Sequence, residues 1–153
     1  MKNTDAPGIV VHPVLVLVAF LVLGTVLDRI WPLPYPVLVP QFVGYVILAF
    51  SAVLLVAANR EFSRYQIELS CSACATTLLV SGPFRFTRNP VYVAFLMALI
   101  GLSVIRSNLW LAAVVIPAGG LLFLLVISKE EVSLARRFGN QYDEYRSSVR
   151  RWL

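Results

Sequence analysis

The chain has 153 residues, of which 59% are hydrophobic and 14% are charged. Ordinary soluble domains carry about 45–50% apolar and about 25% charged residues, so a soluble globular domain, a disordered chain and a collagen-like chain are excluded. The formal net charge is +5, but the basic residues flank apolar segments and show no zinc-ligand spacing, so we expect neither nucleic-acid binding nor a metal site. The composition predicts a single all-α membrane domain, residues 1–153.

Four apolar stretches without Asp, Glu, Lys or Arg predict the membrane-spanning helices. In chain order they cover residues 9–27, 41–58, 90–105 and 109–127. A helix rises about 1.5 Å per residue, so about 19 residues match a hydrocarbon core about 30 Å thick. The third stretch is the shortest of the four. We therefore expect a polytopic, integral membrane protein with four transmembrane helices.

The basic residues predict the orientation of these helices. With four spans, the N-terminus, the connection 59–89 and the tail 128–153 share one side of the membrane. The opposite side carries only Arg29 and Arg106, and the other eleven of the 13 Lys and Arg residues lie on the first side. Cytoplasmic connections are enriched in Lys and Arg, so both termini are expected in the cytoplasm.

Helix-capping signals divide the second half of the chain. Asn89 and Pro90 predict an N-cap and a first-turn proline for the third helix. Residues 106–108 predict a tight connection that joins the third and fourth helices as a hairpin. The Pro-Ala-Gly-Gly sequence at 117–120 predicts a kink or the close approach of a neighbouring helix, although such residues are also tolerated as plain helix breakers in lipid.

A hairpin brings its two ends together, and polar residues stand at both of them. Arg88, Asn89 and Tyr92 open the third helix, and Glu130 and Glu131 follow the fourth. Adjacent carboxylates at the C-terminal end of a helix are unfavourable with the helix dipole and with each other, so they predict a compensating cation, donor or solvent. Successive helical positions lie about 100° apart, so at most one of the two is expected to point into the bundle.

These residues have two interpretations. The first is a polar pocket at the cytoplasmic membrane surface. The second is a set of separate roles: a solvated glutamate pair, an arginine that anchors headgroups, a helix-capping Asn89 and a tyrosine of the membrane interface.

The tail 128–153 shows an amphipathic pattern with a break at Gly139. One helix face of its second part collects the aromatic and apolar residues at spacings of three, four and three, namely Tyr142, Tyr145, Val149 and Trp152. Such a face is typical of a helix that lies in the membrane interface. We expect a cytoplasmic amphipathic helical tail.

Two further features have plain interpretations. Cys71 and Cys74 form one Cys-x-x-Cys spacing without a second pair, which favours reduced surface thiols over a metal or redox site. His12, at the start of the first span, is interpreted as an interface or packed residue.

Several separated motifs occur in order around the hairpin. A Gly-Pro-Phe-Arg-x-x-Arg-Asn-Pro-x-Tyr run at 82–92 is followed by the apolar hairpin, the glutamate pair, Phe-Gly-x-x-Tyr-x-x-Tyr at 138–145, and Arg151. Together they resemble the isoprenylcysteine carboxyl methyltransferase and phospholipid methyltransferase superfamily. The resemblance covers about the C-terminal half of the chain.

This resemblance implies an integral membrane methyltransferase that transfers the methyl group of S-adenosylmethionine to a lipophilic or membrane-soluble acceptor, such as an isoprenylcysteine-like carboxylate, a phospholipid amine or a small thiol. It implies a cofactor site on the cytoplasmic side, with the loop over it shaped by two residues and its walls lined by five: Gly82 and Pro83, then Arg88, Asn89, Tyr92, Glu130 and Glu131. Arg151 is a candidate for orienting an acidic group of the substrate. Carboxylates, an arginine and aromatic groups suit the cationic sulfonium, the carboxylate and the adenine of the cofactor.

The acceptor and two other functions stay open. The carboxyl methyltransferase branch usually has His at the place of Asn89, so O-, N- and S-methylation are not separated. A non-catalytic helical membrane protein or small transporter is one alternative, and a membrane NADPH-dependent reductase, usually with more helices, is another. Proton-coupled carriers normally need an ionisable residue inside a span, and His12 is the only one here.

Overall fold

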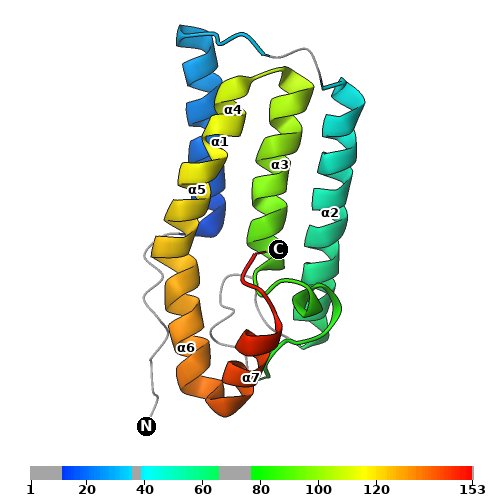
Figure 1. Cartoon of the computed structure of the whole chain (residues 1–153), viewed down its shortest axis with the longest axis vertical. Coiled ribbons are helices and arrows are strands. Elements are labelled where there is room, and N and C mark those ends of the chain that lie inside the picture. The colour runs from blue at the N-terminus through cyan, green and yellow to red at the C-terminus, as the bar shows by residue number, and fades with distance from the viewer. Residues whose placement is uncertain (1–11, 36–38, 66–76, 153) are drawn as a thin grey trace.

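The computed structural model describes residues 12–35, 39–65 and 77–152, and helices are the only regular elements among them. The helices form four columns side by side along the long axis: α1 (Pro13–Ile30), α2 (Gln41–Arg64), α3 (Pro90–Arg106) and the stack of α4, α5 and α6 within Leu109–Phe138 (Figure 1). The predicted all-α class is confirmed. Cys71 and Cys74 lie outside the described residues.

The first two helices extend further toward their C-terminal ends than the apolar pattern predicts. Helix α1 covers Pro13–Ile30 and α2 covers Gln41–Arg64. The sequence after Ala58 is polar, but Glu61 and Phe62 in it are buried. The apolar run ends where the surroundings of α2 change from apolar to polar. The helix itself continues to Arg64, because Glu61 and Phe62 still pack against the protein.

Helix α3, Pro90–Arg106, begins at the predicted proline. Asn89 occupies the N-cap position, but its side chain makes no capping hydrogen bond. The predicted tight connection into the next helix is confirmed: Ser107 adopts a left-handed conformation with φ 49°, and the side chain of Asn108 accepts a hydrogen bond from Leu111 N at 3.0 Å. The third and fourth columns therefore form a hairpin.

The fourth column is one interrupted helix, built from α4 (Leu109–Ala113), α5 (Val115–Leu122), the π-helical turn η3 (Phe123–Ile127) and α6 (Ser128–Phe138). The break at Val114 lies within one turn of Pro117, whose ring nitrogen cannot donate to the preceding turn. The close approach predicted for 117–120 occurs at Gly119, where an added Cβ would meet Leu96 Cδ1 at 3.3 Å, whereas Gly120 has open space.

The glutamate pair was expected at the C-terminal end of a helix, but the helix that holds it continues from Leu109 to Phe138, where the predicted break at Gly139 follows. Glu130 and Glu131 therefore lie inside a continuous helix and not at its C-terminal end. The dipole penalty expected for them does not arise, since the macrodipole acts within the first or last turn.

The chain reverses at Gly139, which has φ +50°, and enters α7, Asn140–Ser148. Tyr142 is 1% exposed and Tyr145 8%, so the aromatic face expected to lie in the membrane interface packs inside the protein instead. After α7 the chain runs back beside the start of α3 (Figure 1). Trp152 then packs against the buried cluster around Tyr92 and Val126.

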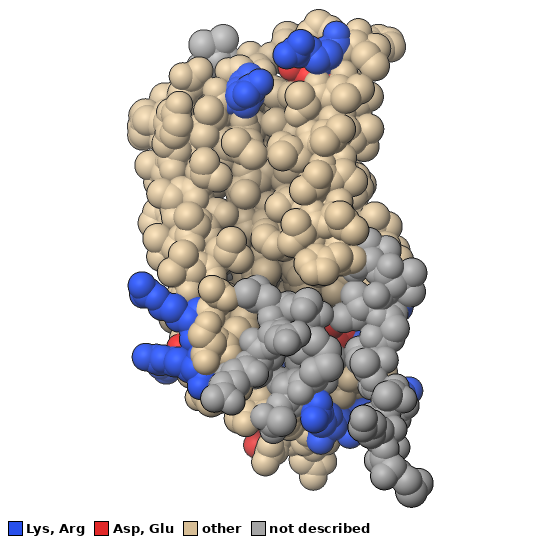
Figure 2. Space-filling model, turned by 180° about the vertical axis from the view of Figure 1, so that it is seen from behind, with Lys and Arg blue, Asp and Glu red and all other residues tan. Residues whose placement is uncertain are grey.

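Within the described ranges, three helices are long and apolar enough to cross a membrane: Pro13–Ile30, Gln41–Arg64 and Leu109–Phe138. Helix α3 is apolar but has only 17 residues. On the face shown in Figure 2, Lys and Arg side chains gather toward the two ends of the molecule and leave an uncharged surface between them. This distribution is typical of a membrane-embedded bundle.

Candidate functional site

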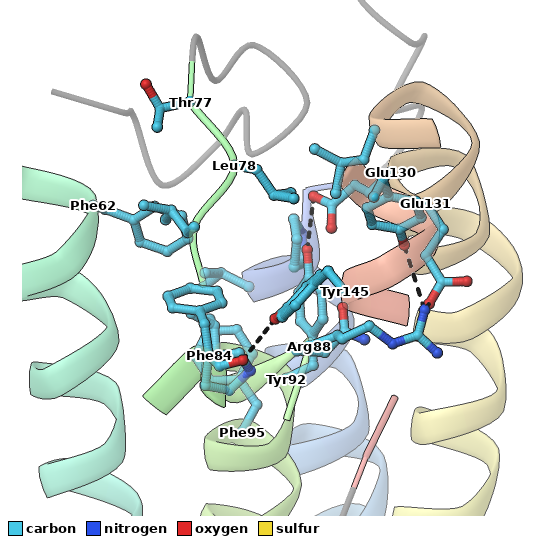
Figure 3. A pocket seen from close by; sticks show the side chains of 18 of the residues that line it. Phe62, Thr77, Leu78, Phe84, Arg88, Tyr92, Phe95, Glu130, Glu131 and Tyr145 are labelled. Carbon is cyan, nitrogen blue, oxygen red and sulfur yellow. Dashed lines mark hydrogen bonds and ion pairs between the residues drawn. The ribbon is translucent and has the colours of Figure 1, made fainter. Parts of the chain in front are cut away.

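A cavity of about 440 Å³ lies where the start of α1, the end of α2, the start of α3, α6 and α7 come together (Figure 3). Ligand pockets in proteins occupy about 300–1,000 Å³. One part of its wall is apolar, with Val14, Phe62, Leu78, Leu79, Phe84, Val91, Phe95 and Leu134. The other part is polar and includes Arg88, Asn89, Tyr92, Glu130, Glu131, Tyr142 and Tyr145. The cavity thus combines a charged wall with an apolar wall.

Glu130 is joined to the first turn of α3. The hydroxyl of Tyr92 donates to Glu130 Oε1 at 3.0 Å, and Glu130 is only 6% exposed. A hydroxyl donor stabilises a carboxylate that has lost its water. The sequence-based prediction that Tyr92 meets the glutamate pair is confirmed.

Glu131 is held by two arginines. Arg88 Nη1 lies 3.1 Å from Glu131 Oε1, and Arg151 donates through Nε and Nη2 to the two carboxylate oxygens at 2.9 Å and 2.8 Å. The side chain of Glu131 is 13% exposed. Both glutamates therefore face inward, although only one was expected to, because α6 meets a different neighbour on each side.

Arg88 carries a donor that nothing in the described chain satisfies. Its side chain is 9% exposed, and Nη1 also lies 3.4 Å from the hydroxyl of Tyr142. Nε is buried and has no hydrogen-bond partner among residues 12–35, 39–65 and 77–152. An unpaired buried donor costs about 1–3 kcal/mol, so the packing of Arg88 at the wall of the cavity carries an energetic cost.

Tyr142 and Tyr145 bring two phenols from α7. Burial raises the pKa of both, and the charge of Glu131 raises the pKa of Tyr142 further. Both therefore stay neutral at physiological pH and can donate. Tyr145 donates to the carbonyl oxygen of Phe84 at 2.7 Å, which ties α7 to the short 3₁₀ turn η2, Gly82–Arg85.

Gly82 and Pro83 support the cavity without being among the residues that line it. Gly82 has φ +56°, and an added Cβ would come within 2.9 Å of Glu61 Cγ. The hydroxyl of Ser81 donates to Glu61 Oε2 at 2.5 Å. This packing sets the turn that places Phe84 against Phe62, with ring centroids 5.5 Å apart.

Asn89 and Arg151 are in contact, but only Asn89 lines the cavity. Asn89 lines the cavity, while its Nδ2 donates to the carbonyl oxygen of Arg151 at 3.1 Å. Arg151 is not among the lining residues. Its guanidinium lies 4.9 Å from the centre of the Phe123 ring and is engaged by Glu131.

The sequence did not identify every residue of the wall. Phe62, Tyr142 and Tyr145 line the cavity, but only the spacing of the tyrosines signalled a shared helix face, and that spacing does not say what the face covers. His12, interpreted as an interface or packed residue, is exposed and also lines the cavity.

Two curated proteins are similar to part of this chain. The nickel-cobalt-cadmium resistance protein NccN of Alcaligenes xylosoxydans xylosoxydans is 32% identical over 46% of this chain and 33% of its own length. The cobalt-zinc-cadmium resistance protein CzcN of Cupriavidus metallidurans is 36% identical over 45% of this chain and 32% of its own length. The chain thus matches about a third of the length of each of these relatives. No solved structure matches it significantly.

One family model covers more than half of the chain. The model of the phospholipid methyltransferase family matches residues 39–141, which include α2, α3, the fourth column and the glutamate pair. With the apolar helices, this match indicates an integral membrane protein of the methyltransferase type. The chain belongs to the phospholipid methyltransferase family.

Proposed function

We propose that this chain binds S-adenosylmethionine in the cavity and transfers its methyl group to a lipophilic or membrane-soluble acceptor. The observation that carries the proposal is the inward-facing pair Glu130 and Glu131, placed with Arg88 on one wall of a cavity whose other wall is apolar. Family membership supports methyl transfer in general.

The polar wall fits the charges of this cofactor. The two carboxylates complement its cationic amine and sulfonium, and the guanidinium charge of Arg88 complements its carboxylate. The aromatic rings of Tyr92, Tyr142 and Phe84 offer faces to the sulfonium and the adenine. Gly82 and Pro83 would act indirectly, through the turn that places Phe84. Asn89 would contribute directly, as a residue that lines the cavity.

The chain's own part in the reaction is to position groups and to exclude water. The bound cofactor supplies an activated methyl group, and transfer to an acceptor needs an aligned approach in a desolvated site. The contacts of Tyr92 with Glu130 and of Arg88 with Glu131 hold both carboxylates before a ligand arrives. Fixed charges of this kind need no reorganisation during the reaction.

The apolar wall supports an acceptor that is at least partly lipophilic. Phe62, Phe84 and Phe95 come from α2, η2 and α3, so the wall continues from the polar end of the site toward the apolar body of α3. A phospholipid amine, an isoprenylcysteine-like carboxylate and a small thiol are the candidate acceptors.

We also propose that the whole chain forms one domain with four membrane spans. In this topology α3 also crosses the membrane, as the third of the four spans, and both termini and the cavity lie on the cytoplasmic side. The excess of Lys and Arg near the cavity end supports this orientation, and the 17 residues of α3 reach the lower end of the range for spanning helices.

Calorimetric titration of the detergent-purified protein tests the function. We expect saturable binding of S-adenosylmethionine and S-adenosylhomocysteine and none of NADPH, followed by methylation of a component in a lipid extract. Binding of NADPH alone would favour the reductase. Binding of none of the three by a folded protein would favour the non-catalytic alternative.

A role in resistance to metal ions is the second candidate, because the names of two relatives carry it. Growth of a gene-deleted strain in nickel, cobalt and cadmium, complemented with wild type or with Glu131→Gln, tests this role. If both forms restore growth equally, metal resistance does not depend on Glu131 and hence not on the proposed site.

A further inference from the structure

The end of the described chain, residues 149–152, forms what we name the C-terminal strap. It crosses the segment that precedes α3 and is fixed there by three hydrogen bonds. Arg88 N donates to the carbonyl oxygen of Arg150 at 2.9 Å, and the side chains of Thr87 and Asn89 both donate to that of Arg151 at 3.1 Å. Thr87 and Asn89 are buried, so the backbone of the strap is held firmly.

The side chains of the strap are held as well. Trp152 packs against the buried cluster that contains Tyr92 and Val126. The guanidinium of Arg151 stacks over Phe123 in η3. Arg151 therefore has little freedom to turn toward another partner, although its side chain is 32% exposed.

This placement determines how Glu131 is presented to the cavity. Arg151 contacts both carboxylate oxygens, and a planar two-pronged contact fixes the orientation of the carboxylate as well as its position. Glu131 Oε1 also meets Arg88 Nη1 at 3.1 Å. Arg151 thus stands behind Glu131, and Glu131 and Arg88 stand at the wall of the cavity.

We propose that Arg151 is a positioning residue of the cofactor site, which acts through Glu131 and does not touch the ligand. This inference rests on the proposed function. It assigns a role to a segment outside residues 39–141, the part of the chain that the family model matches. It also replaces the expectation that Arg151 orients an acidic group of the substrate.

A double-mutant cycle tests the inference, with S-adenosylhomocysteine as the probe and its dissociation constant as the readout. We expect Arg151→Gln and Glu131→Gln each to weaken binding about tenfold, a typical coupling for residues in contact. The double variant should bind no more weakly than Glu131→Gln alone. Arg151→Lys should give an intermediate affinity, because an ammonium keeps the charge but not the fork.

Arg150→Gln is the matched control, because the exposed side chain of Arg150 makes no hydrogen bond or ion pair within the described chain. It should bind like the wild type. If Arg151→Gln does not fold in detergent, the comparison of Arg151→Lys with wild type, each with and without Glu131→Gln, provides the same cycle.

Three outcomes would be contrary. Unchanged affinity of Arg151→Gln would overturn the positioning role alone, and so would losses that add in the double variant, since Arg151 would then act independently of Glu131. Absence of binding by the wild type would overturn the proposed function itself. The two failures are therefore distinguishable.

Discussion

The hydroxyl of Tyr92 and Oε1 of Glu130 lie 3.0 Å apart and join the first turn of α3 to α6 across 38 residues of sequence. Both side chains are at least nine-tenths buried, and both line the cavity. The hairpin of α3 and the fourth column brings them together, because the two columns run side by side from their connection at Ser107 and Asn108 (Figure 1). A carboxylate is thus fixed in a buried site, where the low effective dielectric constant strengthens its interaction with a charged ligand.

Glu130→Gln should weaken binding of S-adenosylhomocysteine by about tenfold or more and leave the protein folded, because it removes a charge without removing volume. Titration calorimetry gives the affinity, and the thermal unfolding midpoint reports the fold. Glu144→Gln, which changes an exposed carboxylate on α7, is the control and should bind like the wild type. Equal affinity of both variants would remove Glu130 from the site.

Arg88→Ala should weaken binding of the same ligand more than Arg85→Ala does. Both arginines belong to the segment before α3, but Arg88 is 91% buried and paired with Glu131, whereas Arg85 is exposed on η2. Removing one partner of a buried ion pair costs about 3–5 kcal/mol when the other charge is left uncompensated, and the cost here should be smaller because Arg151 still pairs with Glu131. The unfolding midpoint of Arg88→Ala should therefore also fall.

Reporter tags at both termini provide the second readout for this pair. If Arg88 serves only as a topology or headgroup anchor, Arg88→Ala would alter membrane insertion and spare ligand binding in the inserted fraction. That result would contradict the proposed role.

Gly44→Val should disrupt the contact of α2 with α3. An added Cβ at Gly44 would come within 2.8 Å of the carbonyl oxygen of Gly101 and 2.7 Å of Ile105 Cγ1, and backbone atoms cannot move aside cheaply. Close packing of small residues is a main source of helix association in membranes. We expect a drop in the thermal unfolding midpoint in detergent and reduced yield of folded protein.

Gly120→Ala is the control for this packing prediction. No atom outside its own helix lies within 4 Å of an added Cβ there, and Ala favours a helix over Gly by about 0.5–1 kcal/mol. The midpoint should stay or rise slightly. Loss of stability in this variant, or none in Gly44→Val, would contradict the packing argument.

The protein should lose stability as the pH rises above about 10, the ordinary pKa of a tyrosine phenol. Burial raises the pKa of Tyr145 and Tyr142 in the folded state, so the unfolded state releases its phenol protons first. The stabilisation by the neutral phenols is complete below pH 10 and declines above it. Unfolding midpoints measured from pH 7 to pH 11 check the sign.

Tyr145→Phe should make this alkaline decline less steep. At pH 7 it should cost about 1 kcal/mol, because the 2.7 Å hydrogen bond to the carbonyl oxygen of Phe84 is lost. Tyr65→Phe, at a position that is 41% exposed, is the control and should keep the wild-type slope. An unchanged slope in Tyr145→Phe would remove Tyr145 as a source of the effect.

The sequence by itself determined the class of the molecule and the two ends of the hairpin. Long uncharged apolar stretches predict helices because, in a membrane core, a helix satisfies all of its backbone groups within one segment. Pro90 marks the start of α3, and Ser107 and Asn108 mark the turn into the next helix, because first-turn prolines and caps act on their neighbours in sequence. The expectation that Arg88 and Tyr92 meet the glutamate pair followed from this connectivity.

Only the tertiary structure decided what the polar residues face. A hydropathy pattern marks where the lipid ends, so it could not show that the fourth column continues to Phe138. The spacing of Tyr142 and Tyr145 defines a helix face but not what that face contacts. The face lines the cavity because the chain reverses at Gly139 and brings α7 against it. The fork of Arg151 on Glu131 joins residues that are 20 positions apart. Such contacts depend on how the chain folds back, which no local pattern encodes.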